Sequence, residues 1–111
     1  MIDIRAAAGR ATTSQPGIVT RHCFSSGSHY DPDNVCFGPL IAVDEHTVEP
    51  GMGFASHRHR GVQILSWVLA GDLSHRDAQA ATTVLPGSVL LQRAGPGIEH
   101  SERNAREDVA L

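Results

Sequence analysis

The segment "PGMGFASHRHRG", residues 50–61, places two histidines one position apart directly after a glycine-rich turn. Side chains two positions apart in a β-strand point to the same side, so His57 and His59 would project into one space if this segment is a strand. A second segment, "IEHSE" at residues 98–102, repeats the spacing with His100 and Glu102. The two segments together predict a polar site built on two strands.

The rest of the chain consists of short apolar runs separated by glycine and proline turns such as "EPG", "AGD" and "LPGS". Helix is weakly supported, because the alanine-rich runs "RAAAG" and "DAQAA" are too short to be stable alone. This pattern predicts an all-β fold, either a sandwich or a closed barrel. The candidate strands are residues 37–43, 47–49, 52–59, 62–69, 73–76, 82–85, 88–92 and 98–102.

One candidate strand, "VQILSWVL" at residues 62–69, is apolar on both of its faces. A strand of this kind is expected to be covered on both sides. We therefore expect Trp67, and Leu91 on a later strand, to lie in the core or in the wall of a pocket.

The length of 111 residues predicts a single domain over residues 1–111. Nine arginines against twelve acidic residues give a net charge of −3, and no basic stripe with interleaved aromatics suggests a nucleic-acid partner. The N-terminus lacks the apolar core of a signal peptide and no segment has the length of a membrane span, so we expect a cytoplasmic protein without a membrane partner. Cys23 and Cys36 fit no metal-binding spacing and are interpreted as reduced thiols, with a bridge between them left open.

Burying His57, His59, His100 and Glu102 in so small a core would cost several kcal/mol unless each side chain finds a partner. One divalent cation would provide partners for all four, and nitrogen and oxygen ligands suit Fe, Mn, Co, Ni, Cu or Zn. Such a site would leave coordination positions open for a substrate. The alternative is a chance pair of surface histidines, which a lone His-x-His cannot exclude. A further histidine, His75, is expected to be structural and hydrogen-bonded to Asp77 or to the backbone; the alternative is that it lines the pocket.

The chain resembles the cupins and, within them, the pirin family. Gly51 stands six positions before His57, and Gly71 closes the segment, as in the first cupin motif; Gly97, His100 and Asn104 fit the second. The segments that resemble pirins more specifically are "HCFSSGSHYDPDNVCFGPL", "HRHRG", "LAGDLSHRDA" and "LPGSVLLQRAGPGIEHSE". They occur in the order found in pirins and extend from about His22 to Asn104.

This resemblance implies a single cupin jelly-roll barrel and a metal ion, iron(II) in the first instance, bound by His57, His59, His100 and Glu102. Some bacterial pirins resemble quercetin 2,3-dioxygenases, so the resemblance implies a dioxygenase that opens the ring of a flavonol or another enolic aromatic compound. In that reaction Glu102 would be the catalytic residue and take the proton of the substrate hydroxyl. The alternatives are a non-catalytic, metal-binding regulatory or protein-interaction module, and a storage or stress-related cupin whose metal only stabilises the barrel.

The chain departs from the family pattern in three places. Gln63 stands where most pirins carry glutamate, and we expect that it could still point inward. Arg58 replaces the usual proline between the two histidines and should point outward, because side chains alternate along a strand. Typical pirins carry two cupin domains, whereas this chain would provide one barrel that is incompletely closed at the C-terminus. An unpaired strand edge invites pairing with another chain, so we expect a homodimer.

Overall fold

The computed structural model describes residues 1–111, and its regular secondary structure consists of β-strands apart from one short 3-10 helix, which confirms the all-β prediction. Contacts group the chain into two compact units, Met1–Thr47 and Val48–Leu111, and the expectation of a single domain stays a prediction. None of its helices has the length and apolar character needed to cross a membrane. The elements are a 3-10 helix η1 (Ala7–Gly9) and the strands β1 (Ala11–Gln15), β2 (Ile18–His22), β3 (Asp44–Val48), β4 (Gly53–His59), β5 (Gln63–Trp67), β6 (Leu73–Asp77), β7 (Ala81–Val84), β8 (Val89–Arg93) and β9 (Ile98–Asn104).

The first unit contains a three-stranded sheet in the order β1-β2-β3. The hairpin between β1 and β2 turns at Gly17, whose φ of 74° favours glycine. One face of β2 is buried and includes His22, whose ring lies 2.8 Å from both Thr13 Oγ1 and Asp44 Oδ1. Both cysteines, Cys23 and Cys36, are free thiols.

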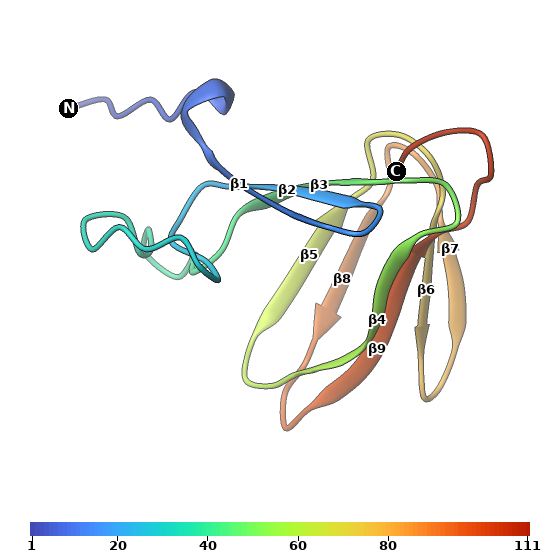
Figure 1. Ribbon diagram of the computed structural model, residues 1–111. Coiled ribbons are helices and arrows are strands. Elements are labelled where there is room, and N and C mark those ends of the chain that lie inside the picture. The colour runs from blue at the N-terminus through green and yellow to red at the C-terminus, as the bar shows by residue number, and fades with distance from the viewer. The chain divides into compact units, whose positions relative to one another are not determined.

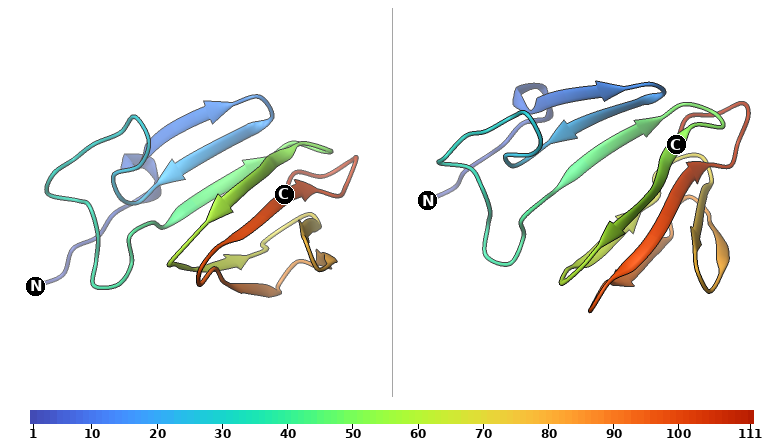
Figure 2. Two further views of the ribbon diagram at one scale, coloured as in Figure 1. Left: turned by 90° about the horizontal axis from the view of Figure 1, so that it is seen from below. Right: turned by 60° about the horizontal axis from the view of Figure 1, so that its bottom comes forward.

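The second unit contains a four-stranded antiparallel sheet in the order β4-β9-β6-β7 and a separate two-stranded sheet of β5 and β8 (Figure 1). Figure 2 shows the same two sheets from two other directions. No strand pairing joins the two sheets, so they do not close into a hydrogen-bonded barrel. This agrees with the expectation of an incompletely closed cupin barrel.

The interior of the second unit is apolar in one part and polar in another. Val68, Leu73 and Val84 form a buried apolar cluster, against which Leu90 and Leu111 pack. Two positions further along β6 and β8, on the same faces as Leu73 and Leu90, the interior side chains are His75 and Gln92 instead. His75, Gln92 and, from the predicted site, His100 are therefore polar side chains inside the protein, where each needs a partner.

The C-terminal segment is held by the amide side chain of Asn104, which is only 2% exposed. Its Nδ2 donates to the carbonyl oxygens of Val48, at 3.1 Å, and Val109, at 2.7 Å, while its Oδ1 accepts from the backbone N–H of Arg106 at 2.9 Å. Val48 and Leu111 also exchange two backbone hydrogen bonds. One buried amide thus ties the end of β9 to the chain on both sides of it.

Replacing Asn104 by leucine is expected to lower the free energy of unfolding by about 2–4 kcal/mol, because three hydrogen bonds are lost and two carbonyl oxygens are left without this donor. Urea denaturation of Asn104→Leu and wild type measures the effect, with Ser101→Ala on the same strand as the control. A change below about 0.5 kcal/mol would contradict this structural role of Asn104.

The sequence prediction was wrong about the N-terminal half of the fold. The polar strands β1 and β2 were missed, and residues 37–43, predicted as a strand, contain only the isolated bridge between Phe37 and Leu40. The strand predicted at 47–49 is β3 and begins at Asp44. The six later strands, β4 to β9, lie where they were predicted, and each strand end is within two residues of its predicted position.

Candidate metal centre

A β-bulge in β4 places the two histidines of the opening segment opposite β9. Phe54 pairs with Glu102 and His57 pairs with His100, so β4 has one residue more than β9 between these two pairs. Such a bulge shifts the alternation of side chains by one position. As a result His57 and His59 share the face of the sheet that carries His100, although a regular strand starting at Phe54 would have pointed Ser56 there.

The glycine-rich part of the segment is needed for the same pairing. A Cβ atom at Gly53 would collide with the carbonyl oxygen of Glu102 and the Cα atom of Arg103. The backbones of β4 and β9 therefore approach closely just before the bulge, and only glycine fits there.

Three imidazole rings converge on this inner face. One ligand nitrogen from each of His57, His59 and His100 lies within 4.8 Å of the other two, and the Nε2 atoms of His57 and His100 are 3.0 Å apart. Two nitrogens bound to one ion at about 2.1 Å and at right angles to each other would also be about 3.0 Å apart. The donor set and its spacing therefore fit a transition-metal ion, and the three histidines could hold one.

Hydrogen bonds on the far side of two rings determine which nitrogens are available. His57 Nδ1 lies 2.8 Å from the carbonyl oxygen of Ala55, which can only accept, so His57 Nδ1 carries the proton and Nε2 presents a lone pair. His100 Nδ1 lies 3.1 Å from His75 Nε2, which directs His100 Nε2 toward His57. This division of roles between the two ring nitrogens is typical of histidines that bind metals.

The surroundings of His100 favour its neutral form. Burial lowers the pKa of the His100 imidazole, the Glu102 carboxylate opposes this shift, and the nearby histidine rings His57, His75 and His59 add to it. Only the neutral imidazole has a lone pair for a metal ion. A lowered pKa therefore keeps His100 ready to bind at a pH at which an exposed histidine is partly protonated.

Glu102, the fourth residue of the predicted site, lies beside the three histidines but outside the group of converging ligand atoms. It occupies the same face of β9 as His100, two positions along, and is partly exposed. Its negative charge acts on His100. The structure thus brings three of the four predicted residues together, and the assignment of Glu102 as ligand and proton acceptor stays a prediction.

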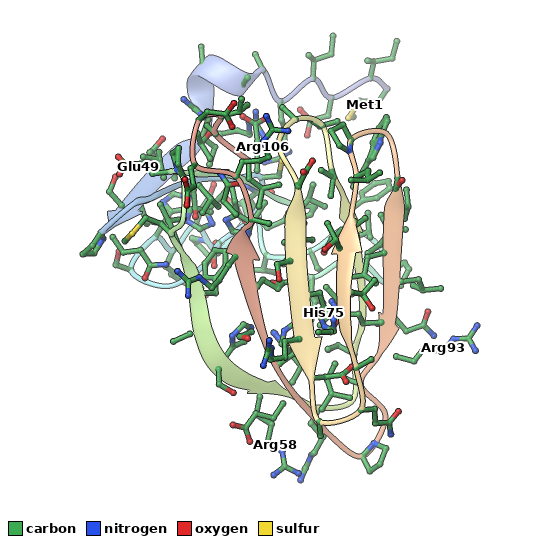
Figure 3. The ribbon with its side chains drawn as sticks, turned by 90° about the vertical axis from the view of Figure 1, so that its right-hand side faces the viewer. Met1, Glu49, Arg58, His75, Arg93 and Arg106 are labelled. Carbon is green, nitrogen blue, oxygen red and sulfur yellow. The ribbon has the colours of Figure 1, made fainter.

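The contacts of His75 differ from the expected ones. His75 Nε2 contacts the side chains of Gln92, at 3.0 Å, and His100, whereas Asp77 accepts hydrogen bonds from the backbone N–H groups of Gln79 and Ala80. Figure 3 shows His75 on β6, within the four-stranded sheet. Gln92 was not predicted as part of the site, and its signal in the sequence is a lone polar residue in the run "VLLQ".

The two unusual residues of the motif point away from the histidines. Arg58 is exposed opposite Glu99 on the outer face, as predicted, and extends away from the sheets in Figure 3. Gln63 is also exposed, and the next residue, Ile64, pairs with the inward-facing Gln92. Gln63 therefore lies on the outer face of β5, and the expectation that it could point inward was wrong.

An all-β fold with three histidines that converge from two paired strands and could hold a metal ion agrees with the cupin class to which the sequence motifs point. The chain belongs to the pirin family, whose sequence model matches residues 4–111. It is 44% identical over 104 residues to a Mycobacterium tuberculosis protein whose name assigns it provisionally to the quercetin 2,3-dioxygenases, and 34% identical over 105 residues to the quercetin 2,3-dioxygenase of Escherichia coli K12. These matches cover 93% and 94% of this chain.

A solved structure resembles the whole of the described fold. The crystal structure of a bacterial pirin from Escherichia coli in complex with nickel(II) superposes with a TM-score of 0.93 at 33% sequence identity, covering 96% of this chain and 47% of that one. The chain spans less than half the length of the curated relatives, 43% of the mycobacterial protein and 46% of the Escherichia coli enzyme.

Proposed function

We propose that this chain is a metal-dependent, pirin-type oxygenase that acts on a flavonol or another enolic aromatic compound. In this proposal His57, His59 and His100 hold one divalent transition-metal ion, iron(II) in the first instance, with Glu102 beside it. The observation that carries the proposal is the convergence of three imidazoles on one inner face, with 3.0 Å between two Nε2 atoms. The Escherichia coli relative named quercetin 2,3-dioxygenase supports the choice of substrate class.

The chemistry follows from the positions of the side chains. A bound divalent ion would act as a Lewis acid and lower the pKa of an enolic hydroxyl group of the substrate. Glu102, on the same face of β9 as His100 and partly exposed, would accept the proton that this hydroxyl releases. The ring of Phe54, edge-on to His57 at 6.3 Å between centroids, would offer an apolar surface to an aromatic substrate.

The experiment is oxygen uptake and carbon monoxide release with quercetin, using full-length chain of measured metal content. We expect turnover by the iron(II)-loaded protein, and a fall in kcat of at least about 100-fold in Glu102→Gln, since general acid–base catalysis contributes about that much. Glu99→Gln, which changes a carboxylate on the outer face of the same strand, is the matched control and should keep wild-type activity. No turnover at full occupancy with any of iron, manganese, cobalt, nickel or copper would reject the oxygenase.

A non-catalytic, metal-binding interaction module is the second candidate, and an apolar surface favours it. The outer face of the β5–β8 sheet exposes four large apolar side chains: Leu65, Trp67, Val89 and Leu91, each more than 50% exposed. Contiguous apolar surface of this kind is typical of protein interfaces. We propose that this face pairs with a second copy of the chain. Sedimentation velocity at micromolar concentration would then show a dimer, whereas a stable monomer would reject the homodimer.

A further inference from the structure

A chain of buried polar side chains continues from the three histidines into the interior. Gln92, His75 and His100 are 7%, 5% and 1% exposed, respectively. Gln92 Oε1 lies 3.0 Å from His75 Nε2, which lies 3.1 Å from His100 Nδ1. His100 Nε2 then faces His57 Nε2 at 3.0 Å. His75 and Gln92 have no part in the chemistry proposed above, yet two apolar side chains could occupy these buried positions without the cost of burying polar groups.

We propose that His75, supported by Gln92, is a positioning residue whose Nε2 accepts a hydrogen bond from His100 Nδ1–H and so directs the Nε2 lone pair of His100 toward the metal ion. The inference rests on the metal site of the proposed function. It assigns His75 and Gln92 to metal affinity, not to contact with the ion or the substrate.

A neutral imidazole ring carries one proton, on either Nδ1 or Nε2. If His100 Nε2 gives its lone pair to a metal ion, the ring proton must be on Nδ1. A buried N–H without an acceptor is costly, and His75 Nε2 is the group that lies within reach of His100 Nδ1. His75 Nε2 must then be the unprotonated nitrogen of its ring, with its own proton on Nδ1.

Gln92 can support either state of His75, depending on which end of its amide faces the ring. Its side-chain Nε2 is buried and has no hydrogen-bond partner, whereas its Oε1 faces His75. A half-turn of the amide exchanges oxygen and nitrogen at almost no change in shape. After this half-turn one N–H of the amide would share the single lone pair of His75 Nε2 with His100 Nδ1–H, in a three-centre hydrogen bond. The rotation thus gives the amide donor a partner and favours the unprotonated form of His75 Nε2.

Without a metal ion the same contacts favour the opposite direction of donation along this chain of hydrogen bonds. His57 Nδ1 donates to Ala55, so His57 Nε2 can only accept, and His100 Nε2 must donate to it. The N–H group at His75 Nε2 is then shared between two acceptors, His100 Nδ1 and Gln92 Oε1. Metal binding and the reversal of this hydrogen-bond chain are therefore one coupled event.

The test compares nickel(II) affinity, measured by calorimetry on the full chain, between wild type, three site variants and one control variant. His75→Leu should bind about 10–100-fold more weakly, which is typical for the loss of a hydrogen-bond partner behind a metal ligand. His75→Gln, whose amide oxygen can still accept from His100 Nδ1, should recover most of that loss. Gln92→Leu should show a smaller loss, and it keeps the inference testable if His75→Leu fails to fold. His29→Gln, which changes a histidine outside the site, is the control.

Nitrogen-15 NMR of the histidine rings gives a readout that a merely structural role would not change. His100 should carry its proton on Nε2 in metal-free wild type and on Nδ1 in the zinc(II)-loaded protein. Wild-type affinity in folded His75→Leu, or in folded Gln92→Leu if only that variant folds, would overturn the inference. So would an Nδ1 proton already present without metal. If His57→Ala loses nickel(II) while these variants keep it, only this inference fails. If wild type binds no nickel(II), zinc(II) or iron(II), the proposed metal site fails and this inference fails with it.

Discussion

Replacing His100 by alanine is expected to weaken binding of iron(II) or nickel(II) by more than about 100-fold, beyond the range seen when only an outer hydrogen-bond partner is lost. His100 is the most buried of the three converging imidazoles, at 1% exposed, and it contacts both His57 and His75. Its removal takes away one of the three proposed ligands and leaves His75 with Gln92 as its side-chain hydrogen-bond partner. Calorimetric titration of the metal-free chain, together with the metal content after dialysis, measures the effect.

His29→Gln is the control for this prediction, because His29 lies in the turn that bridges to Ser26 and not in the site. Circular dichroism of His100→Ala separates lost affinity from lost fold. If the folded variant retains one tightly bound ion per chain, the three histidines are not the metal ligands.

The alternation of side chains along a strand was enough to predict that His57 and His59 share a face and that Arg58 does not. It could not predict which residue of β4 lies opposite His100. The bulge between Phe54 and His57 decides this, and it depends on the close approach of Gly53 to β9. Register between two strands forty residues apart is a tertiary property, so the distances within the site had to come from the structure.

Polar residues inside the fold were the hardest to predict. His75 was expected to be a structural histidine with other partners, and Gln92 was not singled out; only the packing of the β5–β8 sheet against β6 shows that the two contact each other. The strands β1 and β2 were missed for a related reason. Their residues include threonine, serine and arginine, so they lack the apolar alternation by which strands are recognised.

Trp67 and Leu91 show the opposite error. The sequence of β5 is apolar on both faces and predicts a strand covered on both sides, yet Trp67 is 64% and Leu91 52% exposed. An apolar pattern indicates that a strand face is covered, but it does not indicate whether the same chain or another chain covers it. The inner face of β5 is covered by this chain, and the outer face is the surface on which we propose that a second copy docks.

Lowering the pH from 7.5 to 5.5 is expected to weaken metal binding steeply, because protons and the metal ion compete for the same ring nitrogens. The affinity falls by up to about tenfold per pH unit for each imidazole that must lose a proton. Titration with nickel(II) at several pH values measures this. Affinity that does not change over this range would contradict a site made of histidines.

The metal-free protein should also lose stability over the same range, for a separate reason. Burial lowers the pKa of His100 in the folded state, so below the unfolded value of about 6.5 the unfolded chain binds more protons than the folded one. The free energy of unfolding then falls as the pH falls through that window. Urea denaturation of metal-free wild type and His100→Gln at pH 7.5 and 5.5 measures the difference, and an equal loss in both would contradict it. His57→Ala helps to separate the two effects, because it removes a proposed ligand but not His100. Metal binding should be lost, while part of the pH dependence of stability remains, since burial is the largest cause of the lowered pKa of His100 and His57 a smaller one.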